Sequence, residues 1–305
     1  MKVGVNLLNY GPGASPASLL RWSRLAEALG YHFLMISDHV ALTPDVARSY
    51  PAPFYDPFLS LAWLAGRTRT VELGTTVIIL PYRHPLQVAR LASNLDQLSG
   101  GRFIFGVGAG WAAQEFAALG LSVNERGAMT DEYLEVIQAT WAGEVASYHG
   151  RFVAFDAVET GPPPLQRPHP PLWIGGNGPA ARRRAIRFDA AWHPISIRLP
   201  WLRDEALPDL RAQAAAAGKP VPALCPRIRL HLTERPLDEA ERRAGEGTLA
   251  QVRADLQELD ELGASYVLLD TYRGDPAGTL DHEHAWSMLA TLAEQVLDLP
   301  NQRLR

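Results

Sequence analysis

Apolar positions along the chain follow two periods that alternate from one end to the other. Short apolar runs rich in β-branched residues predict strands, and longer stretches with apolar residues at helical spacing predict helices between them. The run at 32–37 is almost continuously apolar, which is typical of a strand buried on both faces of a parallel sheet. Eight strands are predicted in this way, at residues 2–8, 32–37, 71–79, 102–108, 172–176, 190–195, 227–233 and 264–270.

Helical sequence follows each predicted strand. In the stretch 84–100, Pro85 stands in the first turn and Gly100 just past the end, which are the favoured places for both residues. The predicted helices occupy residues 15–30, 56–68, 84–100, 125–143, 179–188, 199–218, two pieces within 237–263, and about 279–297. The alternation breaks once, at about 144–171, where a small hairpin near His149 and a proline-rich connector predict an insertion.

Eight β-α units within 305 residues predict a closed (β/α)₈ barrel, also called a TIM barrel. The chain is expected to form one domain over residues 1–305, with the insertion at about 144–171 placed before the fifth strand. A doubly wound open sheet is the alternative. It is disfavoured because no GxGxxG turn follows the first strand, where such a sheet would bind a dinucleotide.

Composition narrows the class of protein. With 47% apolar and 20% charged residues, the chain resembles ordinary soluble globular proteins. A net charge of -4 argues against nucleic acid or an anionic membrane as a partner. The single cysteine, Cys225, excludes an internal disulfide and fits a reducing compartment. The N-terminus is too short and polar for a signal peptide, and no apolar run reaches membrane-spanning length, so we expect a cytoplasmic protein.

Candidate catalytic groups stand where the second strand ends. In a barrel of this kind the active site lies at the carboxyl ends of the strands. Asp38 and His39 end an apolar strand abruptly, and a histidine there can take or give a proton near neutral pH. The alternative is a helix-capping aspartate beside a surface histidine. We expect the catalytic pair.

Two glycine-rich segments, 106–111 and 174–179, each lie between a strand and a helix. Glycine there lets the backbone approach a flat ring or a phosphate, and a helix N-terminus offers free N–H groups. Of the three arginines at 182–184, at least two are expected on a solvated helix face. The histidines are scattered, and His282 and His284 stand at a spacing that diverges on a helix, so no metal site is expected.

Several short motifs together carry a family resemblance. They are SDH at 37–39, LGTTV at 73–77, YRHP at 82–85, LDQLSGGR at 95–102, GVGAGW at 106–111 and IGGNGP at 174–179. The chain resembles the luciferase-like flavin oxidoreductases, especially the branch that uses the deazaflavin coenzyme F420. The resemblance runs from residue 1 to about 195 and weakens beyond that.

The resemblance implies a cofactor ring that lies across the barrel mouth. Asp38 and His39 would lie beside its reactive face, and Thr76 and Val77 would form a bulge, with a cis peptide bond between them, that supports the ring. Gln114 and Gly108 would lie near the ring or its tail. The loop that would hold the cofactor phosphate comprises Gly175, Gly176, Asn177 and Gly178.

The chain departs from the sugar-phosphate dehydrogenases of this branch. Trp111 stands where they carry a catalytic glutamate, and the only lysines are Lys2 and Lys219, so none is placed to bind a substrate phosphate. A non-phosphorylated substrate is therefore expected, in contact with Tyr10, Trp111 and His193.

Three functions follow as hypotheses. The first is hydride transfer between F420 and an unidentified organic substrate. The second is an FMN-dependent monooxygenase that uses O₂, and the third is a flavin-binding protein without catalytic activity. The expected partner is a small molecule, and a homodimer remains open.

Overall fold

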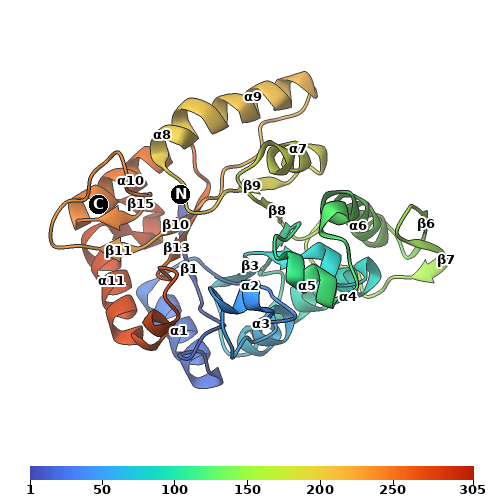
Figure 1. Ribbon diagram of the computed structural model, residues 1–305, viewed down its shortest axis with the longest axis horizontal. Coiled ribbons are helices and arrows are strands. Elements are labelled where there is room, and N and C mark those ends of the chain that lie inside the picture. The colour runs from blue at the N-terminus through green and yellow to red at the C-terminus, as the bar shows by residue number, and fades with distance from the viewer.

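The computed structural model describes residues 1–305 and shows parallel strands arranged around a barrel with helices outside them (Figure 1). The barrel strands are β1 (Lys2–Asn6), β2 (Phe33–Ile36), β3 (Glu72–Thr75), β5 (Phe103–Gly108), β8 (Leu172–Gly175), β9 (Ala191–His193), β10 (Arg227–Arg229) and β13 (Tyr266–Asp270). Neighbours pair in the order β10-β13-β1-β2-β3-β5-β8-β9, and parallel bridges from Trp192 to Leu224 and from Ile195 to Arg227 join the two ends. The prediction of a (β/α)₈ barrel is confirmed.

Apart from the short helices α2 and α5, which were not predicted, and the segment 237–247 described below, the helices begin and end close to the positions that the sequence indicates. They are α1 (Pro16–Leu29), α2 (Pro44–Ala47), α3 (Pro57–Ala65), α4 (Pro85–Ser99), α5 (Ala113–Ala118), α6 (Arg126–Ala142), α7 (Pro179–Arg187), α8 (Leu199–Trp201), α9 (Leu207–Ala216), α10 (Leu249–Glu261) and α11 (His282–Gln295). Ser15 forms a capping box at the start of α1, and Gly100 ends α4 with a left-handed φ of 69°. A π-helical segment, Leu202–Ala206, joins α8 to α9 and brings Pro208 into the first turn of α9.

A small apolar cluster fills the inside of the barrel. Its six buried residues are Phe33, Met35, Ile104, Trp173, Cys225 and Leu268. Gly74 leaves room for this cluster, since a Cβ there would lie 2.8 Å from the Met35 methyl group and 3.1 Å from Ile104 Cβ. A much larger apolar cluster lies between the strands and the surrounding helices. Polar buried groups occur at the carboxyl ends of the strands, and these ends form the site.

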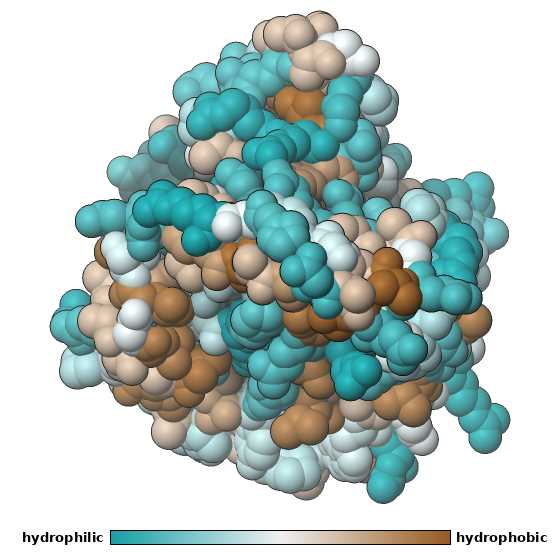
Figure 2. Space-filling view, turned by 90° about the vertical axis from the view of Figure 1, so that its right-hand side faces the viewer, coloured by the Kyte–Doolittle hydropathy of each residue, from teal (hydrophilic) through white to brown (hydrophobic).

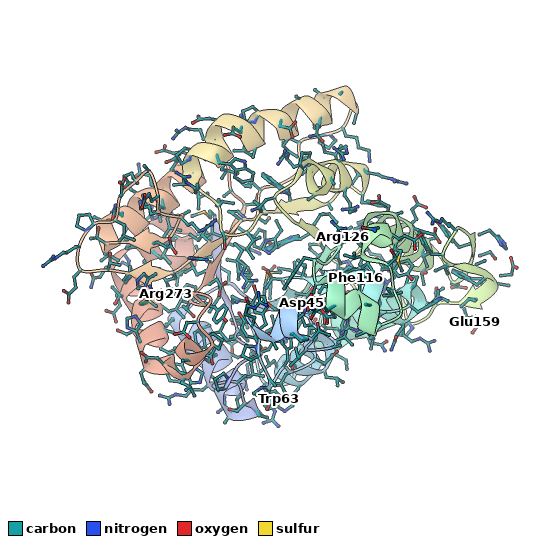
Figure 3. The ribbon with its side chains drawn as sticks, viewed as in Figure 1. Asp45, Trp63, Phe116, Arg126, Glu159 and Arg273 are labelled. Atoms are coloured by element: carbon teal, nitrogen blue, oxygen red, sulfur yellow. The ribbon has the colours of Figure 1, made fainter.

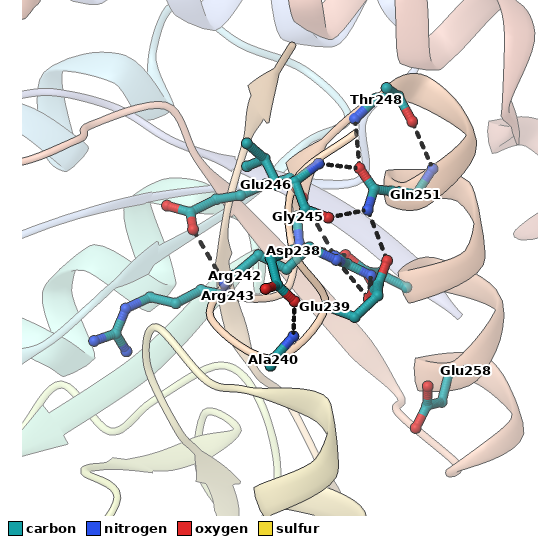
Figure 4. A network of polar contacts seen from close by, with 12 residues as sticks. Asp238, Glu239, Ala240, Arg242, Arg243, Gly245, Glu246, Thr248, Gln251 and Glu258 are labelled. Carbon is teal, nitrogen blue, oxygen red and sulfur yellow. Dashed lines mark hydrogen bonds and ion pairs between the residues drawn. The ribbon is translucent and has the colours of Figure 1, made fainter. Parts of the chain in front are cut away.

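The first part of the segment 237–263 is not a helix, contrary to the prediction. Residues 237–247 form turns that lead from β11 (His231–Leu232) to β12 (Glu246–Gly247), and Gly245 and Gly247 have φ values of 86° and 131° that a helix excludes. Arg242 folds inward and donates to both carboxylate oxygens of buried Asp255 at 2.6 and 2.7 Å. Figure 4 shows the polar network that holds this segment against the start of α10. Side-chain pairing across the segment therefore replaces helical hydrogen bonding.

The expected insertion is present before the fifth barrel strand, β8. It contains an antiparallel hairpin, β6 (Val145–His149) and β7 (Ala154–Glu159), which projects to the right in Figure 1. The Glu132 carboxylate of α6 accepts hydrogen bonds from the backbone of Phe152 and Val153 at 2.7 and 2.8 Å and holds the turn of the hairpin. Seen from this end, hydrophobic surface is interrupted by hydrophilic side chains (Figure 2).

The chain ends in a short antiparallel pair, β14 (Leu297–Asp298) and β15 (Arg303–Leu304), which follows α11. His282 at the start of α11 is half-buried, although the sequence places it in an exposed segment. It accepts a hydrogen bond from the Trp22 indole and contacts the Gly13 carbonyl, both at 3.0 Å. None of the helices has the length and apolar character needed to cross a bilayer.

Candidate active site

A cavity of about 440 Å³ opens at the carboxyl ends of the strands, within the size range of small-molecule sites. Most residues singled out from the sequence line it. These are Asp38, His39, Thr76, Val77, Gly108, Trp111, Gly175, Gly176, Gly178 and His193. They come from the ends of β2, β3, β5, β8 and β9, so the barrel brings together groups that are far apart in the sequence.

The third barrel strand is interrupted at the cavity. Gly74 of β3 pairs with Ile104, and Ile78 of β4 (Ile78–Ile79) pairs with Val107, so this strand carries one residue more than β5 over the same interval. This is the predicted bulge, and the peptide bond between Thr76 and Val77 is cis, as expected. Both residues line the cavity, which a regular strand would not allow.

His39 is held by a buried carboxylate. Its Nδ1 lies 2.6 Å from Glu115 Oε2, and Glu115 Oε1 accepts from the backbone N–H groups of Val40 and Ala41 at 2.7 and 2.9 Å. Burial alone would raise the pKa of Glu115, but the hydrogen bonds from His39 and from these backbone groups lower it. An ionised carboxylate only accepts, so the proton lies on His39 Nδ1. No hydrogen bond joins Nε2 to the protein, and this nitrogen remains available to a molecule in the cavity.

Aromatic rings surround the His39 imidazole. Tyr50 stacks on it with centroids 5.5 Å apart, while Phe54 and Trp111 present their edges at 5.6 and 5.8 Å. Trp111 is 51% exposed, so its indole is open to the solvent at the mouth. The histidine is therefore fixed by packing as well as by Glu115, beside an apolar wall.

Asp38 is fully engaged by its neighbours. Arg83 donates to both of its carboxylate oxygens at 2.6 and 2.9 Å, and the backbone N–H of Ile79 donates at 3.0 Å. Arg83 also reaches Asp56, the residue that caps α3. Asp38 thus ties the end of β2 to the start of β4, next to the bulge.

A second polar network forms the floor of the cavity. His193 Nδ1 donates to the Cys225 carbonyl at 2.5 Å, so its Nε2 accepts from the Thr76 hydroxyl at 2.9 Å. Burial and the nearby charge of Arg227 together lower the pKa of His193 to about 4, although the hydrogen bond to the Cys225 carbonyl acts in the opposite direction. His193 is therefore neutral near pH 7. Arg227 in turn donates to the carbonyl and the hydroxyl of Thr76 at 3.2 and 3.3 Å.

The loop after β8 leads into the N-terminus of α7. The Trp192 indole donates to the Gly176 carbonyl at 2.8 Å and fixes the turn, in which Gly176 has a φ of 126°. Asn177 does not line the cavity, because its amide pairs with both backbone groups of Ile195. Gly178 is the N-cap residue of α7, and a Cβ added to it would meet nothing within 4 Å. This position opens into free space beside the first turn of α7, where Pro179 has no N–H, Ala181 donates to the Gly178 carbonyl at 3.0 Å, and the Ala180 N–H is left unpaired.

The expectation that at least two of the arginines at 182–184 lie on a solvated face is wrong. Arg182 is buried and paired with Asp209, and Arg184 is buried and paired with Asp131, both at 2.6 Å. Only Arg183 is exposed. Arg184 lines the cavity together with Arg126, the first residue of α6.

Gln114 and Tyr10 do not reach the cavity. The Gln114 side chain is exposed and accepts from the Asp45 backbone at 3.3 Å, which ties α5 to α2. Figure 3 shows Asp45, Phe116 and Arg126 along this side of the barrel. Tyr10 is fully buried in an aromatic cluster and contacts Tyr50, which does line the cavity. Neither residue lines the cavity, and each supports a neighbour of it.

The residues of the site that were not singled out from the sequence include Glu115, Tyr50, Arg126 and Arg227. Glu115 follows Gln114 on the short helix α5, and its only signal is a charge placed beside apolar residues on one helical turn. Arg227 opens a strand in which charged and apolar residues alternate, which is a usable signal for a group pointing into a barrel. No local pattern marks Tyr50.

Comparison with known proteins places this geometry in a family. The family model of luciferase-like monooxygenases matches residues 1–244. An F420-dependent glucose-6-phosphate dehydrogenase of Microbacterium testaceum is 33% identical over 70% of this chain and 64% of its own. The oxygenase component of a flavin-dependent trigonelline monooxygenase of Acinetobacter baylyi is 28% identical over 55% of this chain and 45% of its own.

A solved structure with a similar fold covers the whole chain. The monooxygenase RslO1 of Streptomyces bottropensis is 25% identical with a TM-score of 0.79, covering 99% of each chain. The curated relatives are matched over about two thirds of their length or less. The chain belongs to the luciferase-like monooxygenase family, whose members near it include both F420-dependent and flavin-dependent enzymes.

Proposed function

We propose that this protein transfers a hydride between the deazaflavin coenzyme F420 and a non-phosphorylated organic substrate that carries a hydroxyl or carbonyl group. The observation that carries the proposal is the buried pair of His39 and Glu115, which holds Nδ1 and leaves Nε2 without a protein partner at the cavity. Hydride transfer at a carbon that bears oxygen requires a proton to move at that oxygen, and a fixed imidazole is suited to move it.

His39 and Glu115 have different roles: Glu115 orients the imidazole, and His39 transfers the proton. Glu115 fixes the tautomer and the ring position, because its second oxygen is anchored to two backbone N–H groups. His39 Nε2 takes the proton of a substrate hydroxyl when the substrate is oxidised and returns it when a carbonyl is reduced. Tyr50 stacks on the imidazole, and Trp111 contacts it at the mouth of the cavity.

The residues of the cavity fit a flat, phosphate-bearing cofactor. Gly108 and Gly175 face the Val77 side chain so closely that a Cβ on either would lie 2.7 or 2.9 Å from it, which leaves a smooth surface there. Gly178, with open space beside it, and the unpaired N–H of Ala180 at the start of α7 suit a phosphate, and Arg126, which has no carboxylate partner, adds positive charge. When bound, F420 supplies a ring carbon that exchanges a hydride, whereas FMN also reacts with O₂.

The substrate side of the cavity favours an apolar molecule. Phe54, Tyr50 and Trp111 surround His39, and no lysine lines the cavity. The arginines that do line it are engaged by Asp131 or Asp270, or lie at the start of α6. A substrate phosphate would therefore find no free cation beside His39.

FMN-dependent oxygenation is the second candidate. It is supported by the trigonelline monooxygenase relative and by Trp111, which stands where the sugar-phosphate dehydrogenases of the F420-dependent branch carry a catalytic glutamate. The preference for F420 rests on the F420-dependent relative at 33% identity and on the proton-transfer pair. A non-catalytic flavin carrier would have no use for that pair.

A titration distinguishes the two cofactors. Purified protein is mixed with increasing F420 or FMN, and the bound fraction is followed by the fluorescence of each ring. We expect F420 to bind in the micromolar range or tighter and FMN at least about tenfold more weakly, which is a difference of ~1.4 kcal/mol. Equal or tighter binding of FMN would contradict the preferred cofactor.

Gly178→Val tests the phosphate subsite. The new side chain would project into the open space beside the start of α7, where no protein atom lies within 4 Å, so folding should be unaffected. We expect at least a tenfold loss of cofactor affinity with an unchanged melting temperature. Gly278→Val is the matched control, since its added side chain also meets nothing within 4 Å but lies outside the cavity.

A further inference from the structure

Arg227 stands out among the charged groups of the cavity because it lies on the floor and is almost completely enclosed. It is 5% exposed and lines the same cavity as Thr76 and Val77. The other charged groups that line it are Asp38, which Arg83 neutralises, Arg184 of α7, which pairs with Asp131, and Arg126, which begins α6. Any ring that rests on the Thr76–Val77 bulge therefore has Arg227 as its neighbour.

The hydrogen bonds of Arg227 leave one donor unused. Its Nε and Nη2 donate to Asp270 Oδ2 at 3.0 and 2.6 Å, and Nη1 donates to the carbonyl and hydroxyl of Thr76. A guanidinium has five N–H groups, so one on Nη2 has no partner in the protein. A buried unpaired donor of a charged group is costly, which points to a ligand that accepts from it.

The ion pair is oriented with its positive end toward the cavity. Asp270 does not line the cavity, and its other oxygen accepts from the Asn6 amide and the Tyr272 backbone at 2.9 and 3.1 Å. Burial alone would lower the pKa of Arg227, but the charge and hydrogen bond of Asp270, together with Tyr10 and Tyr50, raise it, so the guanidinium stays charged. The pair thus fixes a positive charge at the floor without leaving it uncompensated.

We propose that Arg227 is a cofactor-binding residue that favours the reduced ring, because it places a fixed positive charge beside the Thr76–Val77 bulge where negative charge appears on reduction. A hydride brings two electrons and one proton from the substrate carbon, so the ring gains one negative charge, while the substrate proton leaves to His39. Charge near the ring nitrogens is a principal means by which proteins set the potential of such cofactors. This inference rests on the proposed function.

The test compares the affinities of the oxidised and reduced ring. Dissociation constants for oxidised and reduced F420, and for FMN in both states, are measured without oxygen on four variants. Arg227→Gln/Asp270→Asn replaces the ion pair by a neutral pair of similar size, and Asp270→Asn leaves the arginine without its counter-charge. Arg227→Lys keeps the charge, and Arg229→Gln is the matched control, since Arg229 lies on the same strand and pairs with Glu246 outside the cavity.

We expect the preference for the reduced ring to fall at least tenfold in the neutral pair, which equals about 30 mV for a two-electron couple. It should rise in Asp270→Asn, remain within about threefold in Arg227→Lys and stay unchanged in Arg229→Gln. Equal losses for both redox states, or an unchanged ratio, would overturn the inference and leave Arg227 as a support for Thr76. Absence of binding of any cofactor to the unmodified protein would instead overturn the proposed function, and the inference with it.

Discussion

Two histidines line the cavity, and their hydrogen bonds differ in kind. His39 Nδ1 faces the carboxylate of Glu115, while its Nε2 has no protein partner. His193 has both nitrogens engaged, by the Cys225 carbonyl and the Thr76 hydroxyl. We therefore assign proton transfer to His39 and support of the bulge to His193, although the sequence suggested that both contact the reactants.

Replacing His39 should impair turnover without weakening cofactor binding. We expect His39→Ala to lower kcat by ~10² or more, as for other general acids and bases. Glu115→Gln should also lower kcat, because the amide cannot accept from two backbone N–H groups and His39 as the carboxylate does. Stopped-flow rates of the hydride step and the cofactor dissociation constant are the measurements.

The matched control for Glu115→Gln is Glu144→Gln, the same chemical change at an exposed carboxylate far from the cavity. It should leave both quantities unchanged. Full activity in His39→Ala with a competent substrate would show that the imidazole only packs against Tyr50 and Trp111.

His193 makes the stability depend on pH. Its pKa is about 4 in the folded protein against 6.5 for the free side chain, so between these values the unfolded chain binds a proton that the folded chain does not. Stability is therefore complete above pH 6.5 and falls as the pH drops toward 4, by roughly 3 kcal/mol from this group. Urea unfolding at several pH values should show a shallower dependence in His193→Gln. Identical slopes in both proteins would mean that His193 is charged in the folded state.

At the scale of secondary structure, the spacing of apolar residues and the position of glycine and proline predicted most elements. The exceptions depend on contacts of particular side chains. Gly100 and Pro85 bound α4 as expected, whereas the bulge at Thr76 and Val77 was expected from the family resemblance. Residues 237–247 carry helix-forming side chains, but Gly245 and the inward turn of Arg242 toward Asp255 favour turns. That partner is remote in sequence, so no local pattern could reveal it.

The same pair gives a stability prediction for this segment. Asp255 is 1% exposed, and burial raises its pKa even though the hydrogen bonds from Arg242 lower it. Arg242→Met would leave Asp255 buried with only the Gly245 N–H as a partner, so we expect a loss of ~3 kcal/mol in the free energy of unfolding. Arg203→Met, which breaks the solvent-accessible pairs of Arg203 with Asp204 and Glu258, should cost less than about 1 kcal/mol. Equal effects in denaturant unfolding would contradict this account.

At the scale of the whole molecule, the barrel brings residues that are far apart in the sequence together in one cavity. Strand-end position alone identified Asp38, His39, Gly108 and the loop after β8 as neighbours, because every parallel strand ends at the same rim. The same rule placed Tyr10 and Gln114 at the rim too, yet side chains there also point behind the cavity wall. Which rim residues face inward depends on packing between loops, and that was not readable from the sequence.

For the whole molecule, we propose that a hydride is transferred directly between the substrate and the bound cofactor ring and that no O₂ is consumed. The direct measurement is turnover of the F420-loaded protein with a panel of apolar alcohols and ketones, with and without O₂, beside the same protein supplied with reduced FMN. The account predicts a change in F420 absorbance that equals the product formed, independent of O₂. Uptake of O₂ with reduced FMN, coupled to incorporation of one oxygen atom into the product, would contradict it.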